Sequence, residues 1–239
     1  MIQKNGIFYF PKFQPTGLTY RFSSKKFGDL SRVAPPQNLK KFCQILNISP
    51  DSIIRPKQIH SDFVKIVSAK DKRKIIDNTD GLVIKESDIY LMVVTADCVP
   101  LLFYDPVKRI VGVVHAGWKG TSQKISQKMI LQFQKLDSKV EDIFVLVGPS
   151  ICQKHYEVGN DVLEKFAGQK LDRFVVAKNN KYYLDLKLAN LEHLIESGIK
   201  KDKIIISDFC TFEEENNFYS WRREKPNLEG EFATIIGLV

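Results

Sequence analysis

Three side chains that can bind a metal ion or attack a substrate each follow an apolar, strand-like segment. His60 ends the segment RPKQIH, Cys98 follows LMVVTAD, and His115 ends RIVGVVH. Two imidazoles and one thiol suit zinc, and three protein ligands leave a fourth tetrahedral position for water or substrate, as in catalytic zinc sites. The same residues could instead form a thiolate–imidazole pair, with Cys98 as nucleophile and His115 as base. The spacing along the chain is compatible with both hypotheses.

The segment after His115 has an unusual composition. Gly117 and Gly120 surround Trp118 and Lys119, which indicates close backbone approach or unusual backbone dihedral angles. Gly112 and Gly117 have the glycine spacing of a phosphate-binding P-loop, but Trp118 stands where that motif needs lysine. The sequence also lacks GxGxxG, HExxH, GxSxG and the HxE…PCxxC signature of zinc deaminases. The candidate site therefore depends on the three strand ends.

These residues also have structural interpretations. His60 could be a satisfied core or surface histidine, and Cys98 a small buried side chain. The four cysteines are far apart and form no CxxC pair, which favours free thiols. Cys43, on the apolar face of a predicted helix, is expected to fill the core. His193 is expected to be structural as well.

Length and composition are those of a globular protein. The chain has 239 residues, of which 44% are hydrophobic and 27% charged. No segment reaches the ~18 apolar residues of a membrane span, because Asp97 interrupts the most apolar run, 89–104. The N-terminal residues lack the apolar region of a signal peptide. We therefore expect a soluble, cytoplasmic protein without a membrane partner.

The net charge of +8 permits an anionic partner. The basic clusters 70–74 and 199–203 contain aspartates and lie between apolar segments, so they are predicted to be solvated turns rather than a nucleic-acid surface. A positive field also favours phosphorylated small substrates or inorganic phosphate.

Apolar, β-branched runs alternate irregularly with helical patterns. Helices are predicted at 36–47, 121–136, 161–166 and 186–197, the last of these capped by Gly198. Strands are predicted at 6–10, 17–23, 62–67, 81–85, 89–96, 109–117, 142–149, 203–208 and 232–239. This order predicts one α/β domain, residues 1–239, with a mixed sheet rather than a doubly wound parallel one.

Six segments carry a family resemblance. The sequence resembles the YfiH/YlmD family, also called the laccase-domain or multicopper polyphenol oxidoreductase family. The matching segments run in family order and are KQIH (57–60), DNTDGLVI (77–84), TADCVPLL (95–102), VVHAGWKGT (113–121), GPSICQKHYEVG (148–159) and FYSWRRE (218–224).

The resemblance implies a fold, a metal and an activity. The fold is a layered α/β sandwich with mixed sheets, similar to the catalytic domain of cytotoxic necrotizing factor toxins. The metal is zinc, or alternatively copper, bound by His60, Cys98 and His115. The activity is phosphorolysis of adenosine, inosine, guanosine and methylthioadenosine by inorganic phosphate, with adenosine deaminase activity beside it. A monomer or weak homo-oligomer is expected.

Roles for further residues follow as hypotheses. Arg222 and Arg223 could clamp an oxyanion through their forked donors, or form only a solvated basic turn. Lys119 is another candidate for substrate binding. For deamination, zinc would lower the pKa of a bound water. Asp97 could shuttle a proton, or could orient a histidine ligand.

The sequence departs from the family pattern at two places. Cys152 stands where the family has glycine, and His155 follows in place of cysteine, so either could add metal affinity. Near the last strand, Glu229-Gly230-Glu231 replaces a Thr-Gly-Arg pattern, so a basic group has become acidic. This change bears on the preference for phosphate.

The sequence also bears on three other functions. One is hydrolytic editing of peptidoglycan precursors, in which Cys98 or zinc-bound water would cleave a wrongly added amino acid from a muramyl nucleotide. A true laccase needs several copper centres, which four histidines cannot build. A binding module with a structural zinc would need a fourth protein ligand, such as Cys152 or His155.

Overall fold

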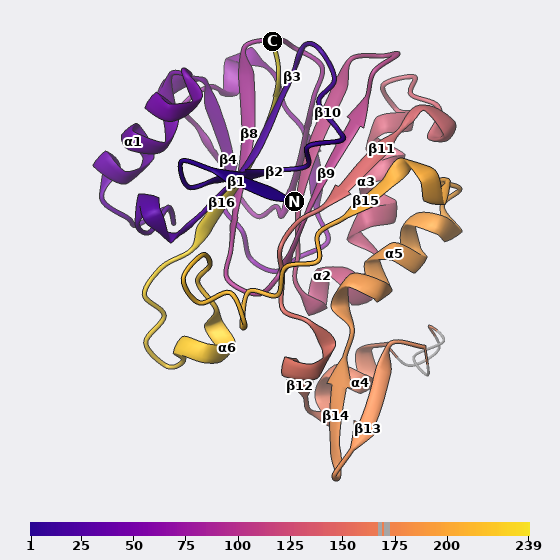
Figure 1. Ribbon diagram of the computed structural model, residues 1–239. Helices are drawn as coiled ribbons and strands as arrows, with labels where there is room; N and C mark the ends of the chain where they lie inside the picture. The colour runs from indigo at the N-terminus through magenta and orange to yellow at the C-terminus, as the bar shows by residue number, and fades with distance from the viewer. Residues whose placement is uncertain (167–168, 170–172) are drawn as a thin grey trace.

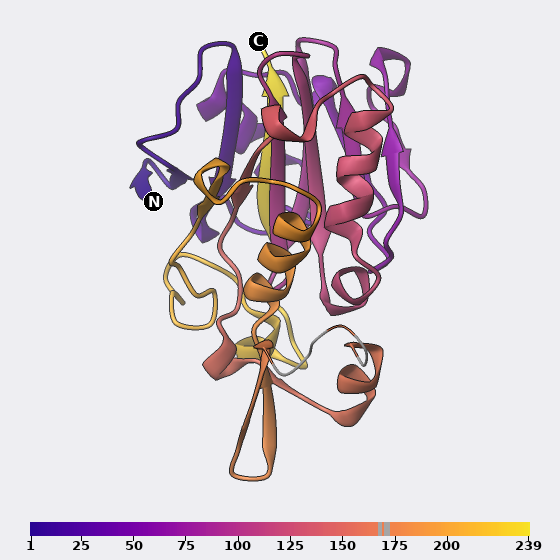
Figure 2. The ribbon, with the colours of Figure 1, turned by 90° about the vertical axis from the view of Figure 1, so that its right-hand side faces the viewer.

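The computed structural model describes residues 1–166, 169 and 173–239, which form a sandwich of two large sheets flanked by helices (Figures 1 and 2). The first sheet has seven strands in the order β1-β2-β3-β16-β8-β4-β6. It is mixed, because β4 runs parallel to β8 and β6 while the other neighbours are antiparallel. Its strands are β1 (Ile2–Lys4), β2 (Ile7–Tyr9), β3 (Leu18–Ser23), β4 (Ile53–Pro56), β6 (Ile75–Ile76), β8 (Ile89–Thr95) and β16 (Phe232–Leu238).

The second sheet has six strands in the order β15-β11-β9-β10-β7-β5. It is also mixed, with parallel pairs only at its two edges. Its strands are β5 (Val64–Ile66), β7 (Gly81–Ile84), β9 (Val99–Asp105), β10 (Ile110–Ala116), β11 (Phe144–Val147) and β15 (Ile204–Ile206). A small third sheet contains β12 (Glu157–Val158), β14 (Lys181–Leu184) and β13 (Val175–Lys178).

Helices cover the outer faces of both large sheets. Helix α1 (Pro36–Leu46) buries Phe42 and Cys43 against the seven-stranded sheet. Helices α3 (Ile125–Gln134) and α5 (Leu186–Glu196) lie on the six-stranded sheet, as Figure 2 shows. The other helices are α2 (Trp118–Ser122), α4 (Asn160–Phe166) and α6 (Trp221–Glu224). Among the described residues, no helix has the length and apolarity to cross a bilayer.

Burial on both faces explains the continuous apolar runs of the central strands. Every residue of β8, β9, β10 and β16 is buried. The main core between the sheets includes Phe22, Leu91, Leu102, Val111 and Phe232. Strands covered on both sides lack the polar–apolar alternation of half-exposed strands, because neither face meets water.

The predicted mixed α/β fold is confirmed, but several strands, among them β4, β9 and β14, lie outside the predicted strand ranges, and one predicted helix is divided. The predicted helix 121–136 is two helices, because Lys124 adopts a left-handed conformation (φ 59°) between α2 and α3. Gly198, with φ +95°, follows the end of α5, in agreement with its predicted role as a stop.

One end of the sandwich gathers chain segments that are distant in sequence. The β8–β9 connection and the end of β10 lie at this end, where Figure 1 also shows α2, α6 and β12. Because long buried strands hold these connections, side chains placed there have a rigid support.

Candidate active site

The three predicted ligands come together at this end of the sheets. His60 follows β4, Cys98 immediately precedes β9, and His115 is the penultimate residue of β10. Cys98 Sγ lies 3.9 Å from His60 Nε2, and one ligand atom from each of the three residues lies within 4.8 Å of the other two. The two imidazole rings meet edge to face, with centroids 4.7 Å apart. The donors thus have the spacing from which one small cation could be bound.

Asp80 holds this cluster in place, although the sequence alone indicated no role for it. Its buried carboxylate accepts a hydrogen bond from His115 Nδ1 at 2.8 Å, and others from the backbone N–H groups of His60 at 3.1 Å and Ser61 at 2.7 Å. In the neutral imidazole, a proton on Nδ1 leaves Nε2 of His115 available as a ligand, and a metal ion bound there would displace the second proton of the imidazolium. The one feature of the sequence that could have indicated a role for Asp80 is its position in the segment DNTDG, directly before the buried strand β7.

The charges in the cluster favour a thiolate. Burial raises the pKa of the Cys98 thiol, but the charge and hydrogen bonds of His115 and His60 outweigh burial and lower this pKa to about 7. Burial opposes protonation of His115, yet Cys98 and Asp80 raise its pKa to about 10. The thiolate is the form of cysteine that binds metal or acts as a nucleophile. Both hypotheses from the sequence therefore have a chemical basis.

Close backbone approach accounts for the two glycines after His115. A Cβ atom on Gly117 would lie 2.9 Å from His60 Cδ2 and 3.1 Å from Cys98 Sγ, and one on Gly120 would lie 2.6 Å from the Ser61 carbonyl oxygen. Gly117 has an ordinary φ of −74°. Of the two predicted explanations, close approach therefore applies at this position.

A cavity of about 430 Å³ opens beside the cluster. Its wall combines the three predicted ligands with three aromatic side chains, two acidic residues and one arginine. The lining residues are His60, Ala96, Asp97, Cys98, His115, Trp118, Tyr156, Leu186, Trp221, Arg222, Leu228 and Glu231. Lys119 is exposed, is not among these residues, and places its ammonium 5.6 Å from the Trp118 ring centroid.

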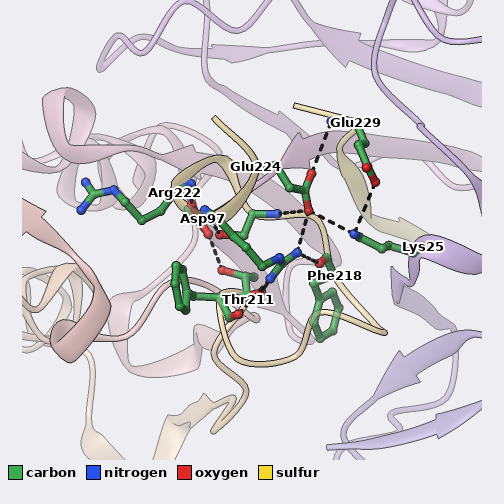
Figure 3. Close-up of polar contacts among 10 residues, drawn as sticks. Lys25, Asp97, Thr211, Phe218, Arg222, Glu224 and Glu229 are labelled. Atoms are coloured by element: carbon green, nitrogen blue, oxygen red, sulfur yellow. Dashed lines mark hydrogen bonds and ion pairs between the residues drawn. The ribbon is translucent and has the colours of Figure 1, made fainter. Parts of the chain in front are cut away.

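Asp97 connects the β8–β9 turn to the C-terminal part of the chain (Figure 3). Its carboxylate accepts hydrogen bonds of 2.7 Å from Thr211 Oγ1 and from the backbone N–H of Arg222. Its backbone is left-handed, with φ 95°. Burial raises the pKa of Asp97, and the two hydrogen bonds oppose that shift only in part. The carboxylate that orients His115 is that of Asp80, and Asp97 instead holds the first turn of α6.

The two adjacent arginines lie in different surroundings. Arg222 lines the cavity, 5.2 Å from the centroid of the Tyr156 ring, and donates a long 3.3 Å hydrogen bond to the His155 carbonyl. The guanidinium of Arg223 is not brought to the cavity. It donates to the carbonyls of Thr211, Phe212 and Phe218 and to Glu224.

Hydrogen bonds and ion pairs around Glu224 connect α6 to the segment before β16. The Glu224 carboxylate accepts from Arg223 and from Lys25 Nζ at 3.0 Å, and Lys25 also lies 3.8 Å from Glu229 (Figure 3). Glu229 therefore belongs to a surface ion pair. Glu231 faces the cavity, and burial raises the pKa of its carboxyl.

Sequence comparisons match almost the whole chain. The profile of the multi-copper polyphenol oxidoreductase laccase family matches residues 24–239. The chain belongs to this laccase family. It is 34% identical to the purine nucleoside phosphorylase YlmD of Bacillus subtilis over 213 residues, which cover 84% of this chain and 76% of that relative. It is 33% identical to adenosine deaminase RL5 of an unknown prokaryotic organism, covering 80% of this chain and 77% of the relative.

Solved structures agree with the family assignment. YlmD from Geobacillus stearothermophilus superposes with a TM-score of 0.90 at 25% identity, covering 100% of this chain and 98% of that one. The hypothetical protein YfiH of Bacillus licheniformis gives a TM-score of 0.88 at 30% identity, with 93% of each chain covered. The arrangement of mixed sheets is thus shared with other members of the laccase family.

Proposed function

We propose that this laccase-family chain is a zinc-dependent enzyme that cleaves purine nucleosides with inorganic phosphate, and that it also deaminates adenosine. The observation that carries the proposal is an open His–Cys–His cluster on the wall of a cavity of about 430 Å³. Small-molecule sites commonly have volumes of roughly 300–1,000 Å³. The relatives named as purine nucleoside phosphorylases and an adenosine deaminase support the substrate class.

The donors fit a zinc ion. His60, Cys98 and His115 supply nitrogen and sulfur, with a tautomer of His115 and a lowered thiol pKa that both suit metal binding. Copper is the other ion that this soft donor set accepts. A metal bound here would supply Lewis acidity at the cavity wall. Among the described residues, no fourth His, Cys or carboxylate joins this cluster, which leaves a position for water or substrate.

The aromatic side chains of the cavity suit a purine base. Trp118, Tyr156 and Trp221 present flat, largely apolar surfaces on which a purine ring can stack. Excluding water from the base also strengthens the hydrogen bonds and charges around it.

Arg222 is the cavity residue that suits phosphate. Its guanidinium lies on the wall and makes one long hydrogen bond to the protein within the described part of the chain, so its other N–H groups can bind an anion. Asp97 fixes its backbone. In this proposal, Asp97 also retains a proton more readily than an ordinary aspartate and gives it to the departing base.

Product analysis by chromatography tests the proposal. The zinc-loaded chain is incubated with adenosine in the presence and absence of phosphate, beside Cys98→Ala. Adenine and ribose 1-phosphate, formed only with phosphate and lost in the variant, would support phosphorolysis, and inosine in both conditions would support deamination. Absence of any purine product would overturn the proposal and favour hydrolysis of a muramyl nucleotide.

A second comparison separates the two arginines. Arg222→Ala should raise the KM for phosphate by more than about tenfold, because a charge-assisted contact is lost. Arg223→Ala should instead lower the thermal stability, because four hydrogen bonds to its guanidinium hold the surrounding loop. Equal effects of both variants on KM would contradict the assignment of phosphate to Arg222.

A further inference from the structure

A second group of metal-binding side chains lies outside the cavity. One ligand atom from each of Cys152, Cys210 and Glu213 lies within 4.8 Å of the other two. Cys210 is buried, Cys152 is half-buried and Glu213 is exposed. The backbone N–H of Cys152 donates to Cys210 Sγ at 3.2 Å, so the two cysteine segments are in direct contact.

Local structure brings these residues together in two pairs. Cys152 precedes the 3-10 helix Gln153–His155, and the Glu213 N–H donates to the Cys210 carbonyl at 3.1 Å in a tight turn. Cys210 and Glu213 are separated by two residues, which is the spacing of the C-x2-C chelating pairs in structural zinc sites. His155 follows Cys152 at the same spacing. A parallel β-bridge between Ser150 and Cys210 holds the two pairs beside each other.

We propose that Cys152, Cys210 and Glu213 form a second site for a soft divalent cation such as zinc. His155 Nε2 lies 3.0 Å from Glu213 Oε1 and serves as the hydrogen-bond partner of the carboxylate ligand. Ligating carboxylates are commonly held by such partners. This site does not depend on the function proposed for the cavity.

The surrounding charges match this ligand set. Binding would release two thiol protons to solvent, and two thiolates, one carboxylate and a divalent cation leave one net negative charge. Lys187 Nζ donates hydrogen bonds to the carbonyls of Ser207 and Phe209. Burial lowers the pKa of Lys187, whereas negative charge on Cys210 and Cys152 raises it, so an anionic site would stabilise this ammonium. Lys154 pairs with Glu213 and therefore competes with the cation.

A disulfide is the other reaction open to two adjacent thiols. Burial and the neighbouring Cys210 raise the pKa of Cys152 to about 12, so its thiolate is scarce until a cation displaces the proton. A disulfide would involve neither Glu213 nor His155. A cation uses all four residues, and a surface hollow lined by Cys152, Gln153 and Lys187 gives it a path.

Occupation of the second site would fasten two segments that support the cavity. The chain after Cys152 reaches Tyr156 on the cavity wall, and Thr211, next to Cys210, holds Asp97. The cation itself would remain outside the cavity. Its contribution is therefore to positioning and stability.

Cobalt binding to the full, reduced chain tests the site. Cobalt bound to thiolates gives a charge-transfer absorption that imidazole ligands alone do not give. In Cys98→Ala, one equivalent of cobalt should still give this absorption. Adding Cys152→Ser or Cys210→Ser should weaken it, because one thiolate ligand remains, and adding both should remove it. Glu213→Gln should weaken binding about tenfold, whereas Lys154→Ala should tighten it severalfold. Lys181→Ala, which alters another exposed lysine–glutamate pair, should leave binding unchanged.

Three results would overturn the proposal. The first is absence of the cobalt absorption in reduced Cys98→Ala. The second is its persistence after Cys152→Ser and Cys210→Ser are both added. The third is a protein isolated without metal that has lost two thiols and two mass units, which would assign the pair as a disulfide. Because Glu213 and Lys154 are exposed, their variants test the site even where a buried cysteine variant fails to fold. No arm of the experiment uses enzyme activity, so its outcome is independent of the proposed function.

Discussion

The cavity cluster (His60, Cys98, His115) and the second cluster (Cys152, Cys210, Glu213) use similar ligand types on different supports. Cys98 and His115 adjoin strands that are buried throughout, and Asp80 ties His115 to the backbone of His60. The second cluster lies on a short 3-10 helix and a turn. The cavity cluster has rigid strands behind it and a cavity beside it, which suits catalysis. The second cluster lies on turns that join two segments of the chain, which suits a stabilising cross-link.

The charges around the two clusters differ as well. In the cavity cluster, burial raises the pKa of Cys98, but the imidazoles of His115 and His60 outweigh burial and lower it to about 7. In the second cluster, burial and a neighbouring thiol raise the pKa of Cys152 to about 12. Residue type therefore leaves the chemistry of a cysteine open, and its neighbours decide it.

The largest expected effect separates the two clusters directly. Cys98→Ala should lower turnover of adenosine with phosphate by more than about 100-fold. Replacing even a residue that only hydrogen-bonds to a metal ligand typically lowers metal affinity or activity by about 10- to 100-fold. Cys152→Ala should change turnover at most about threefold, because that thiol lies outside the cavity. Steady-state kinetics with zinc-saturated protein measures both. Similar losses in the two variants would remove the functional distinction.

Asp80→Asn tests the rigid support of the cavity cluster. Loss of the carboxylate charge weakens the bond to His115 Nδ1 and should lower zinc affinity or activity by about 10- to 100-fold. Competition with a chelator measures the affinity. Ser61→Ala is the control, because it removes only one hydroxyl donor to Asp80 and should cost less than about threefold.

A second buried histidine, His193, has no carboxylate partner like that of His115. Burial lowers the pKa of His193 to about 4, and its Nδ1 has no hydrogen-bond partner among the described residues. The unfolded chain binds this proton below pH ~6.5 while the folded chain does not, so stability present above pH ~6.5 is lost as the pH falls. From pH 7 to 5 the free energy of unfolding should fall by roughly 2 kcal/mol on this account. Denaturant titrations of the chain and of His193→Gln measure it, and equal pH dependence in both would refute this contribution.

Gly117→Ala probes how closely the backbone approaches the cavity cluster. The added methyl group would press on His60 and Cys98, and overpacking of about 1–3 kcal/mol corresponds to about a 5- to 150-fold loss of zinc affinity. Gly159→Ala is the matched control, since its Cβ would meet only the side chain of Asp161. Isothermal titration with zinc compares them. A normal affinity in Gly117→Ala would show that the cluster can shift to accept a methyl group.

The smallest expected effect concerns the acidic cavity wall. Glu231→Gln removes a negative charge that repels phosphate, and should lower the KM for phosphate by about threefold at low ionic strength. The effect should shrink as salt is added. Glu229→Gln is the control, because Glu229 pairs with Lys25 outside the cavity. An unchanged KM would mean that Glu231 does not face bound phosphate.

The sequence was sufficient to predict the mixed α/β class and to select the residues of the cavity cluster. Apolar runs mark buried strands, and His60, Cys98 and His115 stand out at or near their ends. The role of Asp80 was hidden, because it depends on β7 and β10 being neighbours, a long-range relation that local patterns do not carry. The difference between Arg222 and Arg223 was hidden for a similar reason. Successive residues on a helix point in different directions, and only the packed loop shows which one reaches the cavity.

The position of β16 has a consequence for how the protein folds. This strand, Phe232–Leu238, lies between β3 and β8 inside the seven-stranded sheet, although more than half the chain separates it from β8. Pairing such distant segments carries a large loop-closure entropy, which slows the formation of the sheet. The β8–β9 turn with Asp97 and Cys98 can therefore reach its final arrangement only late in folding. Until β16 pairs with it, the apolar strand β8 keeps one edge open, and open edges of apolar strands favour aggregation.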